Sequence, residues 1–368
     1  MNEKLSNFCI VTLVDTISAT SMPINEFVLY RDNMGYQCKQ TIIVLEDTKY
    51  YIDINKCDIH IVNKSIRKIR EIVEKLEKNK NDMNIIYHIH HPKIGMFFYL
   101  ATLGMDIKNR VLFTIHSSFE SRNIKYQISS FICSLLAGKI NCVSKSAYED
   151  YSSVIKNIRA KDFSTISNGV DYNRVQKLLL NSSFDSRRMK KMLCIGRIIP
   201  IKNQEFLIRL LKLLPEYELT LVGAGNDLDR MKQLACNLNL ENRCFFTGLL
   251  PRNEVFKLLK NHGIYLSASV VEGLPISVLE AMSAGLVPVL SDIKPHLEIK
   301  ECCEYVTTLP LDEILWKEKI LELSSVSINE LECLSKKIKS DTVKYFSLDS
   351  MHEKYFNLYS IMCKKGKV

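Results

Sequence analysis

One segment, residues 264–285, constrains the fold more than any other part of the chain. It begins as an apolar, strand-like run, turns at Glu272 and Gly273, and then continues as a helix. Pro275 suits the first helical turn, where its missing N–H would have no partner, and Gly285 suits the position just past the helix end. The residues between them are apolar nearly all round, which predicts a buried helix.

Two carboxylates interrupt this apolar segment, Glu272 before the helix and Glu280 within it. Burying a carboxylate without a partner is costly, so Glu280 requires either an internal donor or a hydroxyl of a ligand. The N–H groups at the start of the helix also form a binding site for an anion. A ligand with several hydroxyls and phosphates would satisfy both groups, whereas a helix cap and a paired core glutamate would satisfy them without a ligand. The segment alone leaves both interpretations open.

The residues around these carboxylates carry a resemblance to a known family. The order Glu272-Gly273-Leu274-Pro275, then Glu280-Ala281-Met282 and Gly285-Leu286-Val287-Pro288-Val289, resembles the nucleotide-sugar site of retaining GT-B glycosyltransferases of family 4, also called glycosyl transferases group 1. The resemblance implies that Glu272 lies beside the donor sugar and that Glu280 binds the ribose hydroxyls. It also implies that the backbone of Gly273, Leu274 and Pro275 meets the diphosphate.

The chain of 368 residues is long enough for two domains. Residues 8–45 read as strand, loop, helix and strand, which is the opening of a doubly wound parallel sheet. We therefore expect the α/β class, and the resemblance implies the GT-B fold, in which two Rossmann-like doubly wound domains face a central cleft. The expected division is 1–185 for an acceptor-binding domain, 186–345 for a nucleotide-sugar-binding domain, and 346–368 for a C-terminal helix that crosses back to the first domain.

The first strand of the second domain ends at Gly196 and leads into a loop that bears Arg197 and Lys202. An arginine fork and a lysine point charge together can neutralise a diphosphate, and the resemblance implies that these residues, with Gly196, clamp the diphosphate of the donor. The alternative is a pair of surface cations. The resemblance also implies that the turn at Gly248 lies near the donor base. The sequence Gly223-Ala224-Gly225 lacks the third glycine of the dinucleotide fingerprint, which excludes a nicotinamide enzyme.

Two strands of the first domain end in histidines, one at His116 and the other at His90. The resemblance implies that His116 reaches the donor sugar or its phosphate and that His90 lines the cleft on the acceptor side. Thr20 and Ser21 belong to the loop after the first strand, which should face the same cleft because ligands bind at the C-terminal ends of parallel strands. His88 and His90 are two positions apart, so they should share one face of their strand. No cysteine or carboxylate stands near them at ligand spacing, and we predict no obligatory metal and no other cofactor.

Composition restricts the expected partners and the expected cellular location. The net charge of +9 is spread along the chain without an arginine-rich tail or a nucleic-acid motif, so nucleic acid is not an expected partner. Mild attraction to anionic lipid would allow peripheral contact with the inner face of the membrane. The 12 cysteines show no zinc-type spacing and indicate a reducing compartment. We find no secretory signal and no apolar run long enough to span a bilayer, so a cytoplasmic location is expected.

Together these features predict a retaining, metal-independent glycosyltransferase. It would move a hexose or N-acetylhexosamine from a nucleoside diphosphate sugar, with a UDP-sugar favoured, to a hydroxyl of a glycan, lipid-linked or small-molecule acceptor. The pathway would be the biosynthesis of cell-envelope polysaccharide or another glycan. Glu272, His116, Arg197 and Lys202 are the expected catalytic residues. The alternatives are a catalytically inactive sugar-binding or scaffold subunit of the same fold, and a nucleotide-sugar epimerase or phosphorylase.

Overall fold

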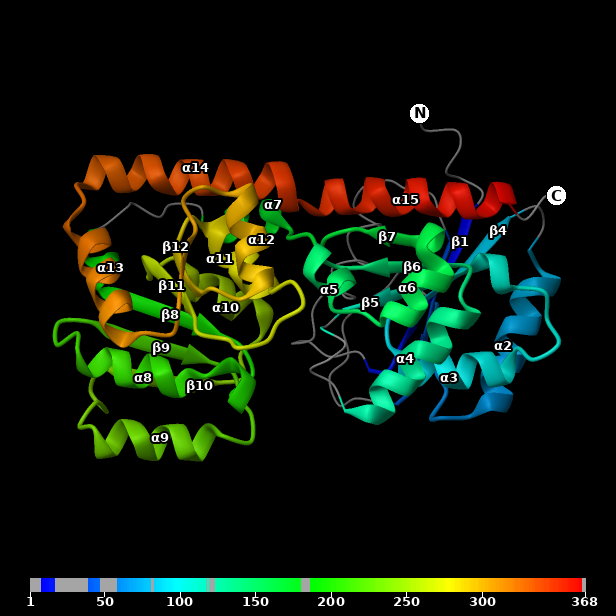
Figure 1. Ribbon diagram of the computed structural model, residues 1–368, viewed down its shortest axis with the longest axis horizontal. Coiled ribbons are helices and arrows are strands. Elements are labelled where there is room, and N and C mark those ends of the chain that lie inside the picture. The colour runs from blue at the N-terminus through cyan, green and yellow to red at the C-terminus, as the bar shows by residue number, and fades with distance from the viewer. Residues whose placement is uncertain are drawn as a thin grey trace. The chain divides into compact units, whose positions relative to one another are not determined.

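The computed structural model describes residues 8–16, 39–46, 58–80, 83–116, 118, 123–179 and 186–365. Within them the chain forms two compact units, which Figure 1 colours along the sequence. The first unit holds the residues up to Asn168 and those from Leu348 onward, and the second holds Gly169–Ser347. The expected acceptor-side residues Thr20 and Ser21 lie outside the described residues.

The first unit is built on a parallel sheet with the strand order β3-β2-β1-β4-β5-β6-β7. The strands are β1 (Phe8–Val14), β2 (Lys39–Val44), β3 (Asp58–Ile61), β4 (Asn84–Ile89), β5 (Val111–Ile115), β6 (Lys139–Cys142) and β7 (Phe163–Thr165). The helices are α2 (Ile66–Lys78), α3 (Pro92–Ala101), η2 (Lys108–Arg110), α4 (Ile124–Leu136), α5 (Lys145–Glu149), α6 (Ser153–Arg159), η3 (Ala160–Asp162) and α15 (Leu348–Lys365).

This sheet separates two apolar layers, because alternate residues of a strand point to opposite faces. In β1, Val11 and Leu13 join the layer that also contains the buried residues of α2, α3 and α4. Ile10 joins the other layer, where Tyr355 and Tyr359 of α15 pack. The C-terminal helix therefore belongs to the core of the first unit, although it is the last element of the chain.

The second unit is built on a parallel sheet with the strand order β10-β9-β8-β11-β12-β13. The strands are β8 (Lys191–Ile195), β9 (Glu218–Val222), β10 (Cys244–Gly248), β11 (Ile264–Ser267), β12 (Val287–Ser291) and β13 (Thr307–Leu309). The helices are α7 (Tyr172–Leu179), η4 (Ser186–Lys190), η5 (Pro200–Lys202), α8 (Gln204–Lys212), α9 (Leu228–Asn237), α10 (Arg252–Leu259), α11 (Ile276–Ala284), α12 (Lys294–Cys302), α13 (Glu313–Ser325) and α14 (Ile328–Phe346).

The division between the units comes before the boundary expected at residue 185. Helix α7 was expected in the first domain, but it packs against α10 and α11 of the second unit. Gln176 of α7 donates a hydrogen bond to the carbonyl oxygen of Ser283 in α11 at 2.7 Å, and Val175 is fully buried. The polar run at 182–191 suggested a linker, but the chain has already passed into the second unit before it reaches that run.

Residues 264–285 form the expected strand, turn and buried helix. In α11 every residue from Val278 to Ala284 is buried. Gly285 ends the helix with φ of 83°, in the left-handed region, and a Cβ there would lie 2.1 Å from Ser335 Oγ. Pro275 lies one position before the helix rather than in its first turn, and its carbonyl oxygen accepts the N–H of Val278 at 3.1 Å.

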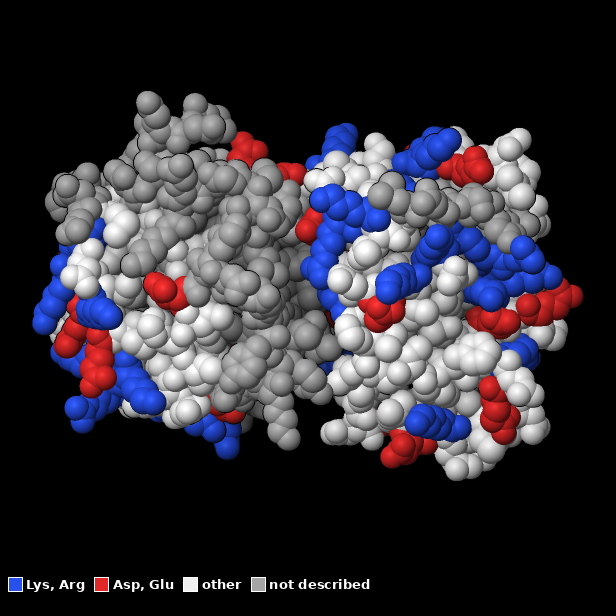
Figure 2. Space-filling model, turned by 180° about the vertical axis from the view of Figure 1, so that it is seen from behind, with Lys and Arg blue, Asp and Glu red and all other residues white. Residues whose placement is uncertain are grey.

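The charged surface is mixed in sign. On the face of the second unit that Figure 2 shows, Lys and Arg side chains lie among Asp and Glu side chains rather than in a single basic field. This pattern is typical of a solvated surface. Among the helices of the described residues, none is both long and apolar enough to cross a membrane.

Arginine side chains from later in the sequence bind the C-terminal carbonyl groups of two helices. Arg159 donates hydrogen bonds to carbonyl oxygens at the end of α4. Arg243 donates from Nη1 to the carbonyl oxygens of Leu214, at 2.7 Å, and Tyr217, at 3.0 Å, just after α8. Helix C-termini carry partial negative charge and unpaired carbonyl groups, so a cation there satisfies both.

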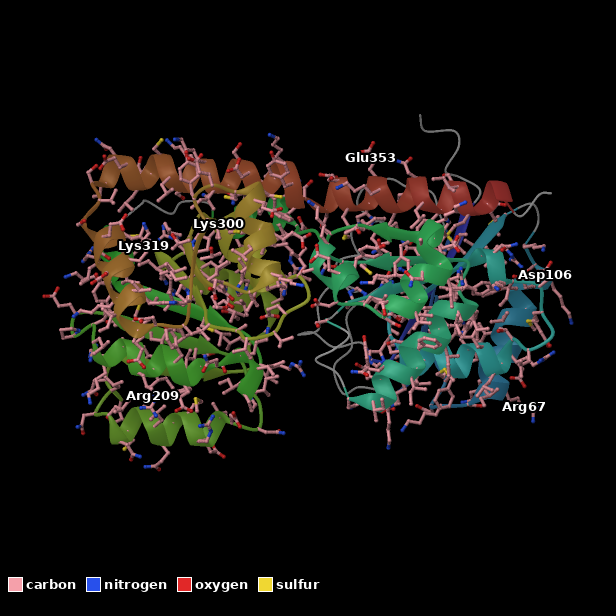
Figure 3. All side chains as sticks on the ribbon, viewed as in Figure 1. Arg67, Asp106, Arg209, Lys300, Lys319 and Glu353 are labelled. Atoms are coloured by element: carbon pink, nitrogen blue, oxygen red, sulfur yellow. The ribbon has the colours of Figure 1, made fainter. Side chains whose placement is uncertain are left out.

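We predict that replacing Arg243 by methionine lowers the free energy of unfolding by about 2–3 kcal/mol, because hydrogen bonds to charged groups each contribute about that much. Urea unfolding followed by circular dichroism measures the change. Arg209→Met is the matched control, since Arg209 (labelled in Figure 3) is exposed on α8 and, in the part of the chain that the structure describes, pairs only with Glu205 one turn away. The control should cost about 0.5 kcal/mol or less. Equal losses in the two variants would show that Arg243 does not stabilise the end of α8.

Candidate active site

The expected site residues of the second unit lie around one point of its sheet. The strand order reverses direction between β8 and β11, so the loops after these two strands meet at the same edge. Arg197 and Lys202 follow β8, and Glu272 follows β11. The backbone N–H of Val270 donates to the carbonyl oxygen of Ile201 at 2.9 Å, which ties the two loops together.

Lys202 and Glu272 form an ion pair across this point. The ammonium group of Lys202 contacts Oε1 of Glu272, and the two side chains are only 18% and 11% exposed. The hydroxyl of Ser269 donates a second hydrogen bond to the same oxygen at 2.7 Å. Because the pair is largely shielded from water, its attraction is screened less than that of a surface pair. The structure thus brings together two predicted residues that are 70 positions apart in the chain.

Two glycines shape the loop that carries Arg197. A Cβ at Gly223 would lie 2.0 Å from the carbonyl oxygen of Gly196, and one at Gly225 would lie 2.0 Å from that of Ile198. The glycines therefore let the loop after β9 pack directly against the loop after β8. Arg197 itself is exposed, and no ion pair joins it to any described residue, so its guanidinium faces solvent at the rim of this loop.

Glu280 has an internal partner. It is 1% exposed inside α11, and its carboxylate forms an ion pair with the guanidinium of Arg252, the first residue of α10. Arg252 is 13% exposed and also lies over the ring of Phe256, with 5.0 Å between its Cζ and the ring centroid. Of the two partners that the sequence left open for Glu280, the structure therefore supplies the internal donor. Arg252 was not predicted from the sequence. The one pattern that points to it is a cation at the start of the helix that follows Gly248.

The backbone expected to meet the diphosphate lies at the start of α11. Gly273 and Leu274 form the turn before the helix, and the N-cap residue, Pro275, makes no side-chain capping hydrogen bond. The amide groups at a helix N-terminus attract an anion. Gly248 ends β10 with φ of 68°, and its carbonyl oxygen accepts the N–H of Gly223 at 2.9 Å. Gly248 thus adjoins the same group of loops.

The histidines of the first unit also lie at a switch point, between β1 and β4. Nδ1 of His91, after β4, is 2.7 Å from Oδ2 of Asp15, after β1. Nδ1 of His90 is 3.0 Å from Nε2 of His116, which follows β5. The rings of His88 and His90 are 3.9 Å apart, which confirms that the two share one face of their strand.

Burial lowers the pKa of His116 to about 4, and the neighbouring His91 acts in the same direction. The ring is therefore neutral near pH 7 and can exchange hydrogen bonds with a ligand hydroxyl without carrying charge. His116 lies in the first unit, and its expected contact with a donor held by the second unit stays a prediction.

No group of three or more His, Cys, Asp or Glu side chains is arranged to hold a metal ion among the described residues. Asp227 and Asp229 form an Asp-x-Asp sequence, and the structure places them at the start of α9, where acidic residues favour the helix dipole. Asp227 also pairs with Arg230 at 3.2 Å. Independence from metal remains a prediction.

Residues 180–322, within the second unit, match the sequence profile of the family described as glycosyl transferases group 1. The chain is also similar to curated glycosyltransferases. It is 25% identical over 251 residues to the UDP-Gal:alpha-D-GlcNAc-diphosphoundecaprenol alpha-1,3-galactosyltransferase of Escherichia coli, an alignment that covers 62% of each chain. It is 25% identical over 237 residues to an uncharacterized glycosyltransferase of Haemophilus influenzae, covering 63% of this chain and 62% of the relative. The matches thus span less than two thirds of these relatives.

Solved structures resemble the chain over nearly its whole length. The structure of Anabaena HepE in complex with UDP and glucose has a TM-score of 0.74 and 16% identity, and covers 95% of this chain and 99% of that one. Sucrose-phosphate synthase from Thermosynechococcus elongatus has a TM-score of 0.77 and 14% identity, covering 96% and 99%. At these identities the likeness concerns the fold, and it confirms the predicted α/β class with two Rossmann-like parallel-sheet units of the GT-B type.

We predict that Arg252→Met lowers the free energy of unfolding by about 3–5 kcal/mol, because it leaves the carboxylate of Glu280 buried without its partner. The double variant Arg252→Met/Glu280→Leu should recover most of this loss, since neither charge then remains. Urea unfolding of the full chain measures both. Lys257→Met, in an exposed pair with Glu254 on the same helix, is the control and should cost about 0.5 kcal/mol. A double variant no more stable than the single one would contradict the buried pair.

Proposed function

We propose that this protein is a glycosyltransferase that transfers a hexose or N-acetylhexosamine from a nucleoside diphosphate sugar to an acceptor hydroxyl, with retention at the anomeric carbon. The observation that carries the proposal is the pairing of Lys202 with Glu272 beside Arg197 and the start of α11. Two cations and the amide groups of a helix N-terminus suit a diphosphate, and a carboxylate beside them suits the sugar that is attached to it.

Charge stabilisation is the main contribution of these residues to the reaction. As the bond to the sugar breaks, negative charge grows on the departing nucleoside diphosphate. Arg197, Lys202 and the amide groups after Gly273 stabilise that charge where it develops, and such stabilisation usually accounts for most of an enzyme's rate enhancement. Glu272 orients the sugar and stabilises positive charge at its anomeric carbon. The ion pair between Glu272 and Lys202 supports this assignment, because Lys202 is one of the two cations that we assign to the diphosphate.

In this proposal Glu280 holds the ribose of the donor, and its ion pair with Arg252 keeps the carboxylate in place. We assign His116, which is neutral near pH 7, a hydrogen bond to the donor, and we assign His90, 3.0 Å from it, to the acceptor side. Closure around the donor would exclude water and so limit hydrolysis.

The similar proteins support a proposal for the substrates. A similar galactosyltransferase is named for UDP-Gal and a diphosphoundecaprenol acceptor, and a structural neighbour was solved with UDP and glucose. They support a UDP-sugar as donor, a glycan or lipid-linked acceptor, a role in polysaccharide biosynthesis, and membership of family 4. A cytoplasmic location with peripheral contact to the inner membrane face accords with such an acceptor.

The two glutamates should give different kinetic effects. Glu272→Gln removes a charge that matters as the bond breaks, so we expect kcat to fall about a hundredfold while the donor KM changes little. Glu280→Gln removes a contact made in ground state and transition state alike, so it should mainly raise the donor KM. Initial-rate kinetics with a panel of UDP-sugars measures both effects.

Glu254→Gln, an exposed substitution on α10, is the control for these kinetics, and melting curves must show that every variant folds. Reversed effects would overturn the assigned roles. If the unmodified protein neither hydrolyses nor transfers any nucleotide sugar but still binds one, it is an inactive sugar-binding subunit instead. Conversion of one nucleotide sugar into another would instead identify an epimerase.

We also expect turnover without a divalent metal, because Arg197 and Lys202 take the place of a metal at the diphosphate. Activity should stay within about twofold after dialysis against a chelator, since cationic side chains can supply the charge stabilisation. Complete loss of turnover that magnesium or manganese restores would show that this expectation is wrong.

A further inference from the structure

The two oxygens of the Glu272 carboxylate have different surroundings. Lys202 and Ser269 both bind Oε1, with the Ser269 hydroxyl at 2.7 Å. No described residue donates a hydrogen bond to Oε2. A carboxylate held through one oxygen has a fixed orientation and still offers the lone pairs of the other oxygen to a ligand.

Ser269 is itself held in place by residues from the next strand. The hydroxyl of Ser291, at the end of β12, donates to the carbonyl oxygen of Ser269 at 2.5 Å. Both serines are buried, and the chain between them includes the whole of α11. Because the hydroxyl of Ser291 has one proton, this bond fixes the direction in which it donates.

His296, in the first turn of α12, completes the group. Its Nδ1 is 2.8 Å from the carbonyl oxygen of Ser291 and 3.1 Å from the Ser291 hydroxyl. A carbonyl oxygen only accepts, so Nδ1 carries the proton and Nε2 is left as the acceptor facing Ser267 at 3.5 Å. The hydrogen bonds therefore run in one direction, from His296 to Ser291, from Ser291 to Ser269, and from Ser269 to Glu272.

The ring of His296 is completely buried, and this burial lowers its pKa to about 4. The negative charge of Glu272 acts against the lowering and the positive charge of Lys202 adds to it. Near pH 7 the ring is thus neutral, as the directed hydrogen bonds require.

We propose that Ser269, Ser291 and His296 are positioning residues that hold Glu272 by Oε1 and present Oε2 to the donor sugar. The inference rests on the proposed function and adds to it the atom of Glu272 that faces the sugar. Lys202 binds Oε1 from the diphosphate side, while Ser269 holds it from within the unit. A small displacement of a reacting group can cost about a hundredfold in rate, so the loss of this support should appear in turnover.

The decisive variant is Ser269→Ala, which removes the hydroxyl bonded to Glu272 without changing any charge. We expect kcat for the preferred nucleotide sugar to fall by about 10- to 100-fold, with the donor KM and the Kd of UDP within about threefold. Ser291→Ala should give a smaller fall of the same kind. Ser283→Ala is the matched control, since Ser283 is equally buried but, among the described residues, its hydroxyl bonds only to the backbone of α11.

His296 provides a readout that does not depend on activity. Nitrogen NMR of the ring in the full chain should show the neutral tautomer with the proton on Nδ1 at pH 7. His296→Asn keeps a donor near the position of Nδ1 and should retain most of kcat. His296→Leu has no such donor and should lower kcat by about the same factor as Ser291→Ala. Melting curves separate a loss of turnover from a loss of folded protein.

Three outcomes would contradict the positioning role of Ser269, Ser291 and His296. An unchanged kcat in folded Ser269→Ala, an equal fall in Ser283→Ala, or a charged or Nε2-protonated His296 would overturn it. If unmodified protein binds no UDP and turns over no nucleotide sugar, the proposed function fails instead, and the NMR result still tests the hydrogen-bond order. A fall in UDP affinity equal to the fall in kcat would show that the serines support the whole loop rather than the carboxylate.

Discussion

The second unit depends on the pairing of two shielded carboxylates with two cations from other parts of the chain. Glu272 is paired with Lys202, and Glu280 with Arg252. Removing a carboxylate from water is costly, and only a close partner offsets the cost. The loop after β8 and the start of α10 must therefore lie against the segment that contains both glutamates, and this requirement fixes the shape of the candidate site.

The topology of the sheet makes these pairings available. In each unit the order of the described strands reverses once, and the loops on either side of the reversal carry side chains that pair with each other. Lys202 meets Glu272 in the second unit, and His91 meets Asp15 in the first. Parallel strands place all their C-terminal ends at one edge, so residues far apart in sequence converge there without any special loop. The glycines at 223 and 225 then allow the closest approach of the loops after β8 and β9.

Behind the charged pair, the polar groups are arranged so that each has a partner. Ser269, Ser291 and His296 form a buried series in which every donor meets an acceptor, and it ends on the carboxylate of Glu272. Such fully paired networks give a rigid local structure, because any other arrangement would leave a buried polar group without a partner. The unit thus combines a rigid support inside with an exposed cation, Arg197, at its rim.

The sequence by itself determined the features that depend on neighbouring residues: the buried strands, the buried helix α11 and the left-handed glycine that ends it. The family resemblance of the sequence also pointed to Lys202 and Glu272, which the structure brings into contact. Backbone conformation and hydrophobic periodicity are local properties, so they can be recognised in a short stretch of sequence. Only the tertiary structure decided that Arg252 pairs with Glu280, that His296 supports Glu272 through two serines, and that α7 belongs to the second unit. These contacts join residues that are distant in the chain, and no local pattern marks them, because each depends on which loops the order of the strands brings to the same edge of the sheet.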